Sequence, residues 1–317
     1  MSDAPSRPPV RRLTPYQRRA TGVLVSSAGV LGLWAIFVNT RLGQAVDTLA
    51  MFGLQATSAP TQQLISVLHT AISYGGLGLI LLLAVVTALL RRRPHLALRA
   101  VGAIVGANLT TQVLKTAVLP RPDLYVNWAT PPSLPSGHTT AAASTAVAFI
   151  MVAPIITRAW MSLVGTVWVV FVGMTTLMSG WHRPSDVLAA VLVATAWGLL
   201  LAPNESGRVV GHGVRRKIAA AGWITLGTGA TFLMLVAVLV ARSAILQDFA
   251  GQIVFTSATG HPLWAVLSAV GATLAVIGVT AIAMREIDLV RSELRPPARP
   301  AAPPHAGHRG VGRSRYP

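Results

Sequence analysis

The chain has 317 residues, of which 53% are hydrophobic and only 11% are charged. Soluble domains usually carry about 25% charged residues, so this composition argues against an ordinary soluble enzyme. Cysteine is absent, which excludes disulfides and thiol chemistry. The net charge of +17 would suit a nucleic-acid-binding protein, so the placement of the basic residues along the chain has to decide that question.

Eight apolar stretches are long enough to cross about 30 Å of hydrocarbon, which takes roughly 20 helical residues. The first stretch is not followed by a small-residue cleavage site, so we interpret it as a membrane anchor and not as a signal peptide. In chain order the predicted spans cover about 20–39, 70–90, 100–118, 138–157, 160–180, 185–202, 218–241 and 262–284. The sequence therefore predicts an all-α fold, a polytopic transmembrane helix bundle.

The chain divides into five segments by composition. The tail is rich in Pro and Arg and has almost no large apolar residues, so we expect it to be disordered. The segments are a basic cytoplasmic N-terminus (1–19), a six-span core (20–202), a basic cytoplasmic loop (203–217), two additional spans (218–284) and the basic tail (285–317).

The basic residues predict the orientation in the membrane. With the N-terminus in the cytoplasm, 21 of the 26 Lys and Arg residues fall on the cytoplasmic side. Anionic lipid at the inner surface then explains the net charge, and no nucleic-acid partner is needed. We expect a multi-pass plasma-membrane protein with both termini in the cytoplasm. Lys115, Arg121 and Arg183 fall on the outer side near span ends, where ionisable residues are functional candidates.

Three polar motifs lie at predicted span ends that alternation places on the same, outer side. The end of the third span and the starts of the fourth and sixth spans can therefore share one site. The motifs are Lys115 with Arg121-Pro122, Pro135-Ser136-Gly137-His138, and His182-Arg183-Pro184-Ser185-Asp186.

The residue types in these motifs favour phosphoryl transfer. Lys115 and Arg121 supply positive charge and donors for phosphate oxygens. Ser136 can cap the fourth span, whose free N–H groups would then point at an anion, and Gly137 lets the backbone approach closely. A lone lysine near a span end usually snorkels and a lone Ser-Gly is usually a cap, but all three motifs on one face favour a phosphate site.

Two histidines suit a nucleophile and a general acid, because imidazole titrates near neutral pH. Asp186 follows His182 by four residues, so one helical turn would bring its carboxylate beside the ring, where it could fix the tautomer. No acidic cluster that could hold Mg²⁺ is visible. We therefore expect a reaction that needs neither metal nor cofactor.

These motifs resemble the type 2 phosphatidic acid phosphatase (PAP2) superfamily of membrane lipid phosphatases. Pro135-Ser136-Gly137-His138 matches one part of the family signature fully, and His182 with Asp186 matches another. The resemblance covers roughly residues 40–202 and implies a six-span PAP2-like core with two further spans behind it.

The resemblance also implies roles for the residues. His182 would attack phosphorus and form a phosphohistidine intermediate, Asp186 would orient and stabilise it, and His138 would protonate the leaving oxygen. Water would then hydrolyse the intermediate. The phosphate would be held by Lys115, Arg121, Ser136 and the Gly137 amide.

The chain departs from the family pattern at two places. Lys115 and Arg121 are separated by five residues instead of six, which on a continuous α-helix would turn them to different faces. The mismatch is tolerable if Arg121 comes from a loop, as Pro120 suggests. The family's Ser-Arg pair falls on Thr175-Thr176, so one phosphate-binding arginine is missing, and Arg183 is a candidate replacement.

The leading hypothesis is an integral membrane phosphatase acting on a lipid phosphate or diphosphate at the outer leaflet. A polyprenyl phosphate or diphosphate is favoured over phosphatidylglycerophosphate or phosphatidic acid. A phosphotransferase is a close variant. The alternative is a catalytically weakened homologue that binds or transports an anionic lipid, or serves in an envelope complex. The last two spans could dock a protein partner, whose identity the sequence does not give, or shape the lipid entrance. The outer loop at 242–261, with Asp248 and His261, could reach over the site.

Overall fold

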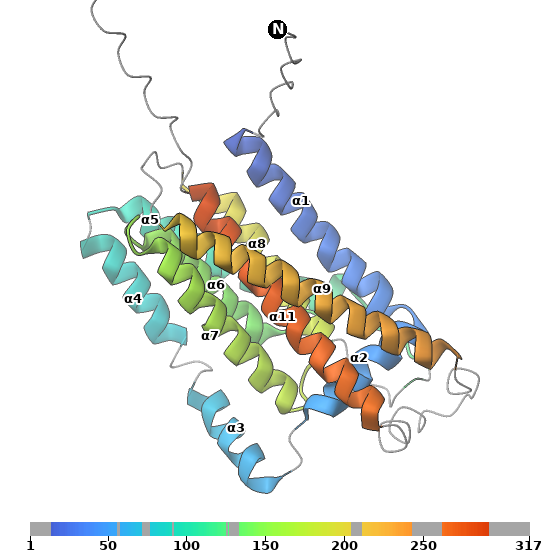
Figure 1. Cartoon of the computed structure of the whole chain (residues 1–317). Helices are drawn as coiled ribbons and strands as arrows, with labels where there is room; N and C mark the ends of the chain where they lie inside the picture. The colour runs from blue at the N-terminus through green and yellow to red at the C-terminus, as the bar shows by residue number, and fades with distance from the viewer. Residues whose placement is uncertain are drawn as a thin grey trace, which may run out of the picture.

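The structure, a computed structural model, describes residues 14–55, 58–71, 77–90, 92–124, 126, 133–203, 211–242 and 262–291. These residues are mostly helical, and none of them belongs to a β-strand (Figure 1). The α-helices are α1 (Pro15–Leu33), α2 (Arg41–Leu54), α3 (Ala59–Ala71), α4 (Leu77–Leu90), α5 (Pro94–Val113), α6 (Gly137–Val152), α7 (Arg158–Met178), α8 (Pro184–Leu201), α9 (His212–Arg242) and α11 (Pro262–Arg291). Two π-helical turns, η1 (Trp34–Val38) and η3 (Leu114–Val118), extend α1 and α5.

Six helices in the described part of the chain are long and apolar enough to cross a membrane, which confirms the predicted all-α polytopic bundle. They cover Tyr16–Val38, Pro94–Val118, Arg158–Met178, Pro184–Leu201, His212–Arg242 and Pro262–Leu289. The predicted second and fourth spans correspond to α4 and α6, which have only 14 and 16 residues. Both still pack into the bundle, α4 against α5 and α6, and α6 against α7 and α8.

Helix α8 lies at the centre of the bundle and contacts α1, α5, α6 and α11. Its Val191 is fully buried in a core shared with Val147 of α6 and Met284 of α11. Alanine and glycine are frequent at these contacts, as expected where membrane helices approach closely. The helix that follows His182 is therefore held from several sides.

The outward faces of the outer helices are strongly apolar. Leu24 on α1, Leu82 on α4 and Trp223 on α9 are each more than half exposed. A soluble monomer rarely exposes apolar residues on this scale, whereas lipid solvates them without cost. The exposed surface therefore indicates a bundle surrounded by lipid.

The two ends of the bundle differ chemically. At one end, called here the basic end, arginines of α1 and α5 contact the C-terminal parts of other helices. Arg18 pairs with Glu286 of α11 at 2.7 Å, and Arg99 donates to the Leu201 carbonyl of α8 at 3.1 Å. These arginines belong to the set predicted to be cytoplasmic. The other end, called here the site end, carries η3 and the first turns of α6 and α8 (Figure 1).

The last two helices, α9 and α11, are joined by glycine contacts and one buried ion pair. A Cβ added at Gly229 would lie 2.6 Å from the Gly271 carbonyl oxygen, so the two backbones touch. Arg215 makes a two-pronged contact with Asp288 at 2.5 and 2.8 Å, and both side chains are almost fully buried. The pair is thus anchored internally as well as against the rest of the bundle.

Several sequence predictions lie outside the described residues. They concern the basic residues before position 14, the part of the cytoplasmic loop at 204–210, Asp248 and His261 in the loop at 243–261, and the tail at 292–317.

Candidate active site

The second and third motifs meet at the site end. Ser136, just before α6, donates its main-chain N–H to the Asp186 carbonyl on α8 at 3.0 Å. The rings of His138 and Trp181 lie 5.9 Å apart between centroids, which joins the two motifs a second time. Two segments some 45 residues apart in the chain therefore form one local structure, as the topology argument predicted.

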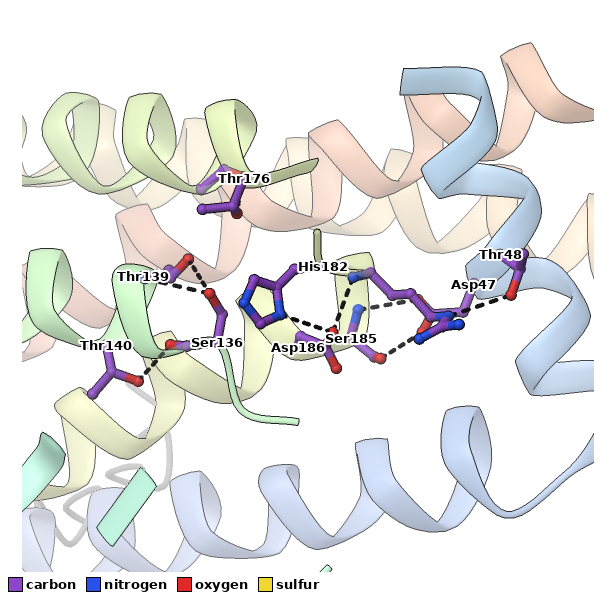
Figure 2. Close-up of polar contacts among 11 residues, drawn as sticks. Asp47, Thr48, Ser136, Thr139, Thr140, Thr176, His182, Ser185 and Asp186 are labelled. Carbon is purple, nitrogen blue, oxygen red and sulfur yellow. Dashed lines mark hydrogen bonds and ion pairs between the residues drawn. The ribbon is translucent and has the colours of Figure 1, made fainter. Parts of the chain in front are cut away.

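His182 and Asp186 form a buried hydrogen-bonded pair. Nδ1 of His182 lies 3.2 Å from Oδ2 of Asp186, and the same oxygen accepts the Arg183 main-chain N–H at 3.0 Å. His182 is 8% exposed and Asp186 is fully buried. A carboxylate at Nδ1 favours the tautomer with its proton there, which leaves the Nε2 lone pair available for attack. Figure 2 shows this pair beside Ser136 and Ser185.

His138 occupies the first turn of α6 and is half-buried. The charges of His182 and Lys115 act on His138. This coupling brings all three motifs together, because Lys115 belongs to the first motif, His138 to the second and His182 to the third. The position of His138 suits a group that exchanges a proton with a bound anion.

Ser136 is the N-cap of α6, as the sequence predicted. Its hydroxyl oxygen accepts from the Thr139 main chain at 3.4 Å and from the Thr139 hydroxyl at 3.1 Å, and Ser136 is fully buried. A Cβ placed on Gly137 would meet nothing closer than Gln112 Nε2 at 4.0 Å, so the space beside this glycine is open. The uncapped N–H groups of this turn can therefore face an anion.

Lys115 lies in the π-helical turn η3, which the sequence analysis did not foresee. The phase argument for Lys115 and Arg121 assumed regular α-helix, but a π turn contains more residues and redirects the side chains after it. The helix then ends at Val118, and Arg121 follows in an irregular segment, as Pro120 suggested. The spacing mismatch therefore carries no structural conflict.

Arg121 is placed by the first two helices of the chain. Trp34 of η1 donates its indole N–H to the Pro120 carbonyl at 3.0 Å, and Gln44 of α2 donates to the Pro122 carbonyl at 3.1 Å. The two anchored carbonyls flank Arg121 in sequence. Burial, and next the positive charge of Arg183, lower the pKa of Arg121, while Asp186 and Asp47 oppose the shift. The positive charge of Arg183 therefore acts on Arg121.

Sequence reasoning missed the contribution of α2. Asp47 is buried and accepts two hydrogen bonds from Ser185, from the main-chain N–H at 3.0 Å and from the hydroxyl at 2.5 Å. Thr48 accepts from Nε of Arg183 at 3.4 Å. Figure 2 shows both α2 residues at the end of the polar row that begins at Ser136. The available signal was a rare acidic residue, one of only nine, inside an apolar helix.

The charged form of Asp47 is disfavoured by its surroundings. Burial, and next the negative charge of Asp186, raise its pKa to about 6, although the Ser185 hydrogen bonds and Arg183 pull the other way. The described site holds three cations, Lys115, Arg121 and Arg183, against the two carboxylates. The excess of positive charge at the site end favours an anionic ligand.

The position of the missing family arginine is occupied by a short neutral side chain. Thr175 and Thr176 lie on α7, and their hydroxyls donate back to the Val172 and Gly173 carbonyls at 2.8 and 2.7 Å. They therefore supply no charge. Among the described residues, no group of three or more His, Asp or Glu side chains is arranged to hold a metal ion, and independence of metal stays a prediction.

Comparison with protein families gives one match, to the PAP2 superfamily over residues 96–208. The match begins later than the predicted range of 40–202, so α1 to α4 lie outside it, while all the predicted site residues lie inside it. Comparisons with curated proteins and with solved structures gave no match. The match agrees with the Pro-Ser-Gly-His and His-Asp motifs that meet at the site end, and residues 96–208 are therefore similar to the PAP2 superfamily.

Proposed function

We propose that this protein is an integral membrane phosphatase that hydrolyses a lipid phosphate or diphosphate through a phosphohistidine intermediate. The observation that carries the proposal is the His182–Asp186 pair, in which Nδ1 contacts Oδ2 at 3.2 Å. This contact leaves Nε2 as the free nucleophilic atom, beside a cluster with excess positive charge. Similarity to a superfamily of membrane phosphatases supports the same reaction class.

The reaction has two steps, formation and hydrolysis of the phosphohistidine. In the first, Nε2 of His182 forms a bond to phosphorus, the bond between phosphorus and the lipid oxygen breaks, and His138 gives that oxygen its proton. In the second, water attacks phosphorus, His138 takes back a proton, and the N–P bond breaks to release phosphate. Asp186 stabilises the imidazolium character that develops on His182.

Phosphate oxygens are bound by Lys115, Arg121, the Ser136 hydroxyl and the Gly137 amide at the start of α6. Arg183 takes the place of the missing family arginine, because its electrostatic coupling to Arg121 brings a second guanidinium to the site. An anion between two guanidinium groups relieves their repulsion and desolvation together. The Thr48 contact holds Arg183 in this position.

The substrate is a membrane lipid, and a polyprenyl phosphate or diphosphate is the favoured class, with phosphatidylglycerophosphate and phosphatidic acid as alternatives. The site end faces the outer leaflet of the plasma membrane, and the basic end with both termini faces the cytoplasm. The asymmetric distribution of arginine supports this orientation.

The direct test is phosphate release by the purified protein in detergent, with a chelator present and without added metal. His182→Ala should abolish release, whereas His95→Ala, on α5 near the basic end, should leave it unchanged. Brief reaction with ³²P-labelled substrate should give an acid-labile, base-stable label that His182→Ala lacks. Undiminished release by His182→Ala would refute the mechanism.

Two outcomes of the same assay separate the variants of this function. Transfer of phosphate to an added alcohol instead of water would identify a phosphotransferase. Tight binding of lipid phosphate by the wild-type chain without any release would identify a binding-only homologue. Thr176, which stands where the family signature has an arginine, is the reason to test for this outcome.

A further inference from the structure

An apolar groove of about 340 Å³ runs along the lipid-facing side of α8, between α1 and α5. Its floor is formed by Leu192 and Trp197 of α8, and its walls by Val30 and Leu31 of α1, Thr110 of α5 and Leu114 of η3. The volume lies at the lower end of the range for small-molecule sites. The groove lies outside the set of polar residues described above.

The groove exists because α1 and α5 both pack tightly on α8. A Cβ added at Gly29 of α1 would lie 2.8 Å from Leu192 Cδ1, and one added at Gly106 of α5 would lie 2.7 Å from the Trp197 ring. Glycine at these two places brings both helices against α8. The Trp197 indole also donates to the Thr110 hydroxyl at 3.0 Å, which fixes the ring in the floor.

The outer end of the groove leads toward the phosphate site along each of its three helices. In η3, which extends α5, Leu114 directly precedes Lys115. On α8, Leu192 follows Asp186 by six residues, about 9 Å along a helix. On α1, Val30 precedes by four residues Trp34, which binds the Pro120 carbonyl next to Arg121. The groove is therefore continuous with the elements that carry two of the cations and the nucleophile.

We propose that this groove holds the hydrocarbon chain of the lipid whose phosphate binds at the site end. This inference rests on the proposed function, because it takes the anionic head of the same ligand to lie at Lys115 and Arg121. An apolar trough open to lipid on one side suits a chain that enters from the bilayer without crossing water.

The first test measures binding alone, using the His182→Ala variant in detergent so that substrate is not consumed. A long-chain alkyl phosphate with a diazirine in the chain is photolysed, and the labelled peptides are identified by mass spectrometry. Label should concentrate on the groove-lining residues of α1, α5 and α8. Excess unlabelled alkyl phosphate should displace it, and the corresponding alcohol should not. Label spread evenly over all exposed helices would overturn the proposal.

The second test fills the groove with larger side chains. Ala196→Phe places a ring on the floor and Leu31→Phe places one on the wall. Each variant should reduce specific cross-linking by about tenfold. Leu109→Phe, at a lipid-facing position of α5 outside the groove, is the matched control and should change nothing. Normal cross-linking in both filled variants would count against the groove.

A third comparison separates failure of the groove from failure of the proposed function. In the catalytically intact chain, the filled variants should lose hydrolysis of long-chain phosphates and keep hydrolysis of p-nitrophenyl phosphate, which has no chain. Equal loss on both substrates would refute the groove. Absence of hydrolysis on every substrate in the wild-type chain would refute the proposed function. The cross-linking experiment would still test whether the groove binds a hydrocarbon chain.

Discussion

Ser185 at the start of α8 donates both its main-chain N–H and its hydroxyl to Asp47, which lies 138 residues earlier on α2. Ser185 is three residues from His182 and adjacent to Asp186. The carboxylate on α2 therefore fixes the turn that carries His182 and Asp186. Asp47 acts as a positioning residue, because it contacts the backbone of this turn.

The first prediction concerns the pH dependence of stability. The pKa of Asp47 is raised from 3.8 to about 6, so the folded chain holds the proton more tightly than the unfolded chain does. The stability that this proton contributes is present below about pH 4 and is lost as pH rises through 6, by roughly 3 kcal/mol. Asp47→Asn should remove this slope in thermal unfolding between pH 4.5 and 7. Asp123→Asn, at an exposed position, should keep it, and a slope unchanged in Asp47→Asn would contradict the assignment.

The second prediction concerns Asp186. Asp186→Asn preserves the size of the side chain but no longer stabilises an imidazolium or enforces the tautomer with Nε2 free. We expect kcat to fall by roughly two to four orders of magnitude with a small change in KM. Steady-state kinetics on a lipid phosphate checks this split. A rise in KM alone would assign Asp186 to binding.

The third prediction concerns His138 and the leaving group. If His138 protonates the leaving oxygen, His138→Ala should slow the release of an alkyl phosphate far more than that of p-nitrophenyl phosphate. The nitrophenolate leaves without help from an acid, whereas an alkoxide does not. Equal slowing on both substrates would assign His138 to phosphate binding instead of proton transfer.

The fourth prediction concerns the exchanged arginine. Arg183→Ala should raise KM, because the phosphate loses one guanidinium at the site. Adding Thr176→Arg to that variant should lower KM again, since it restores a cation at the position where the family signature has one. Restoration by Thr176→Arg but not by Thr176→Leu would show that charge is the cause. No effect of Arg183→Ala would remove this residue from the site.

The fifth prediction concerns the buried pair between α9 and α11. Asp288→Ala leaves Arg215 buried without its counter-charge and should cost about 3–5 kcal/mol. The double variant Arg215→Met with Asp288→Leu removes both charges and should recover most of that loss. Thermal unfolding in detergent checks both. A double variant as unstable as the single one would show that the two charges are not coupled.

The local parts of the site could be predicted from the sequence because they depend on neighbouring residues. The Ser136 cap follows from the preference of serine for the N-cap position. The four-residue spacing of His182 and Asp186 predicted their contact, although His182 lies just before α8 and only Asp186 lies on the helix. The roles of Asp47, Trp34 and Gln44 depend on contacts across 78 to 138 residues, which no local pattern encodes.

The sequence predicts that the membrane-spanning segments are helical, but it does not predict their lengths. Hydropathy predicted the helices of the bundle except α2 and α3, and α4 and α6 are shorter than a full span. The π turn at Lys115 was not predictable, because the period assumed for a helix is that of the α form. Both differences arise where tertiary packing, and not propensity, sets the backbone.

The burial of α11 has a practical consequence for work with shortened chains. Met284 and Ile287 are fully enclosed between α6, α7 and α8, and a Cβ on Gly198 would already press on Ile287 at 3.1 Å. A chain shortened after residue 208 would keep the three motifs and lose α11, whose side chains fill the core of the bundle. Inactivity of such a shortened chain would then reflect the loss of this packing, so the variants above are best made in the full chain.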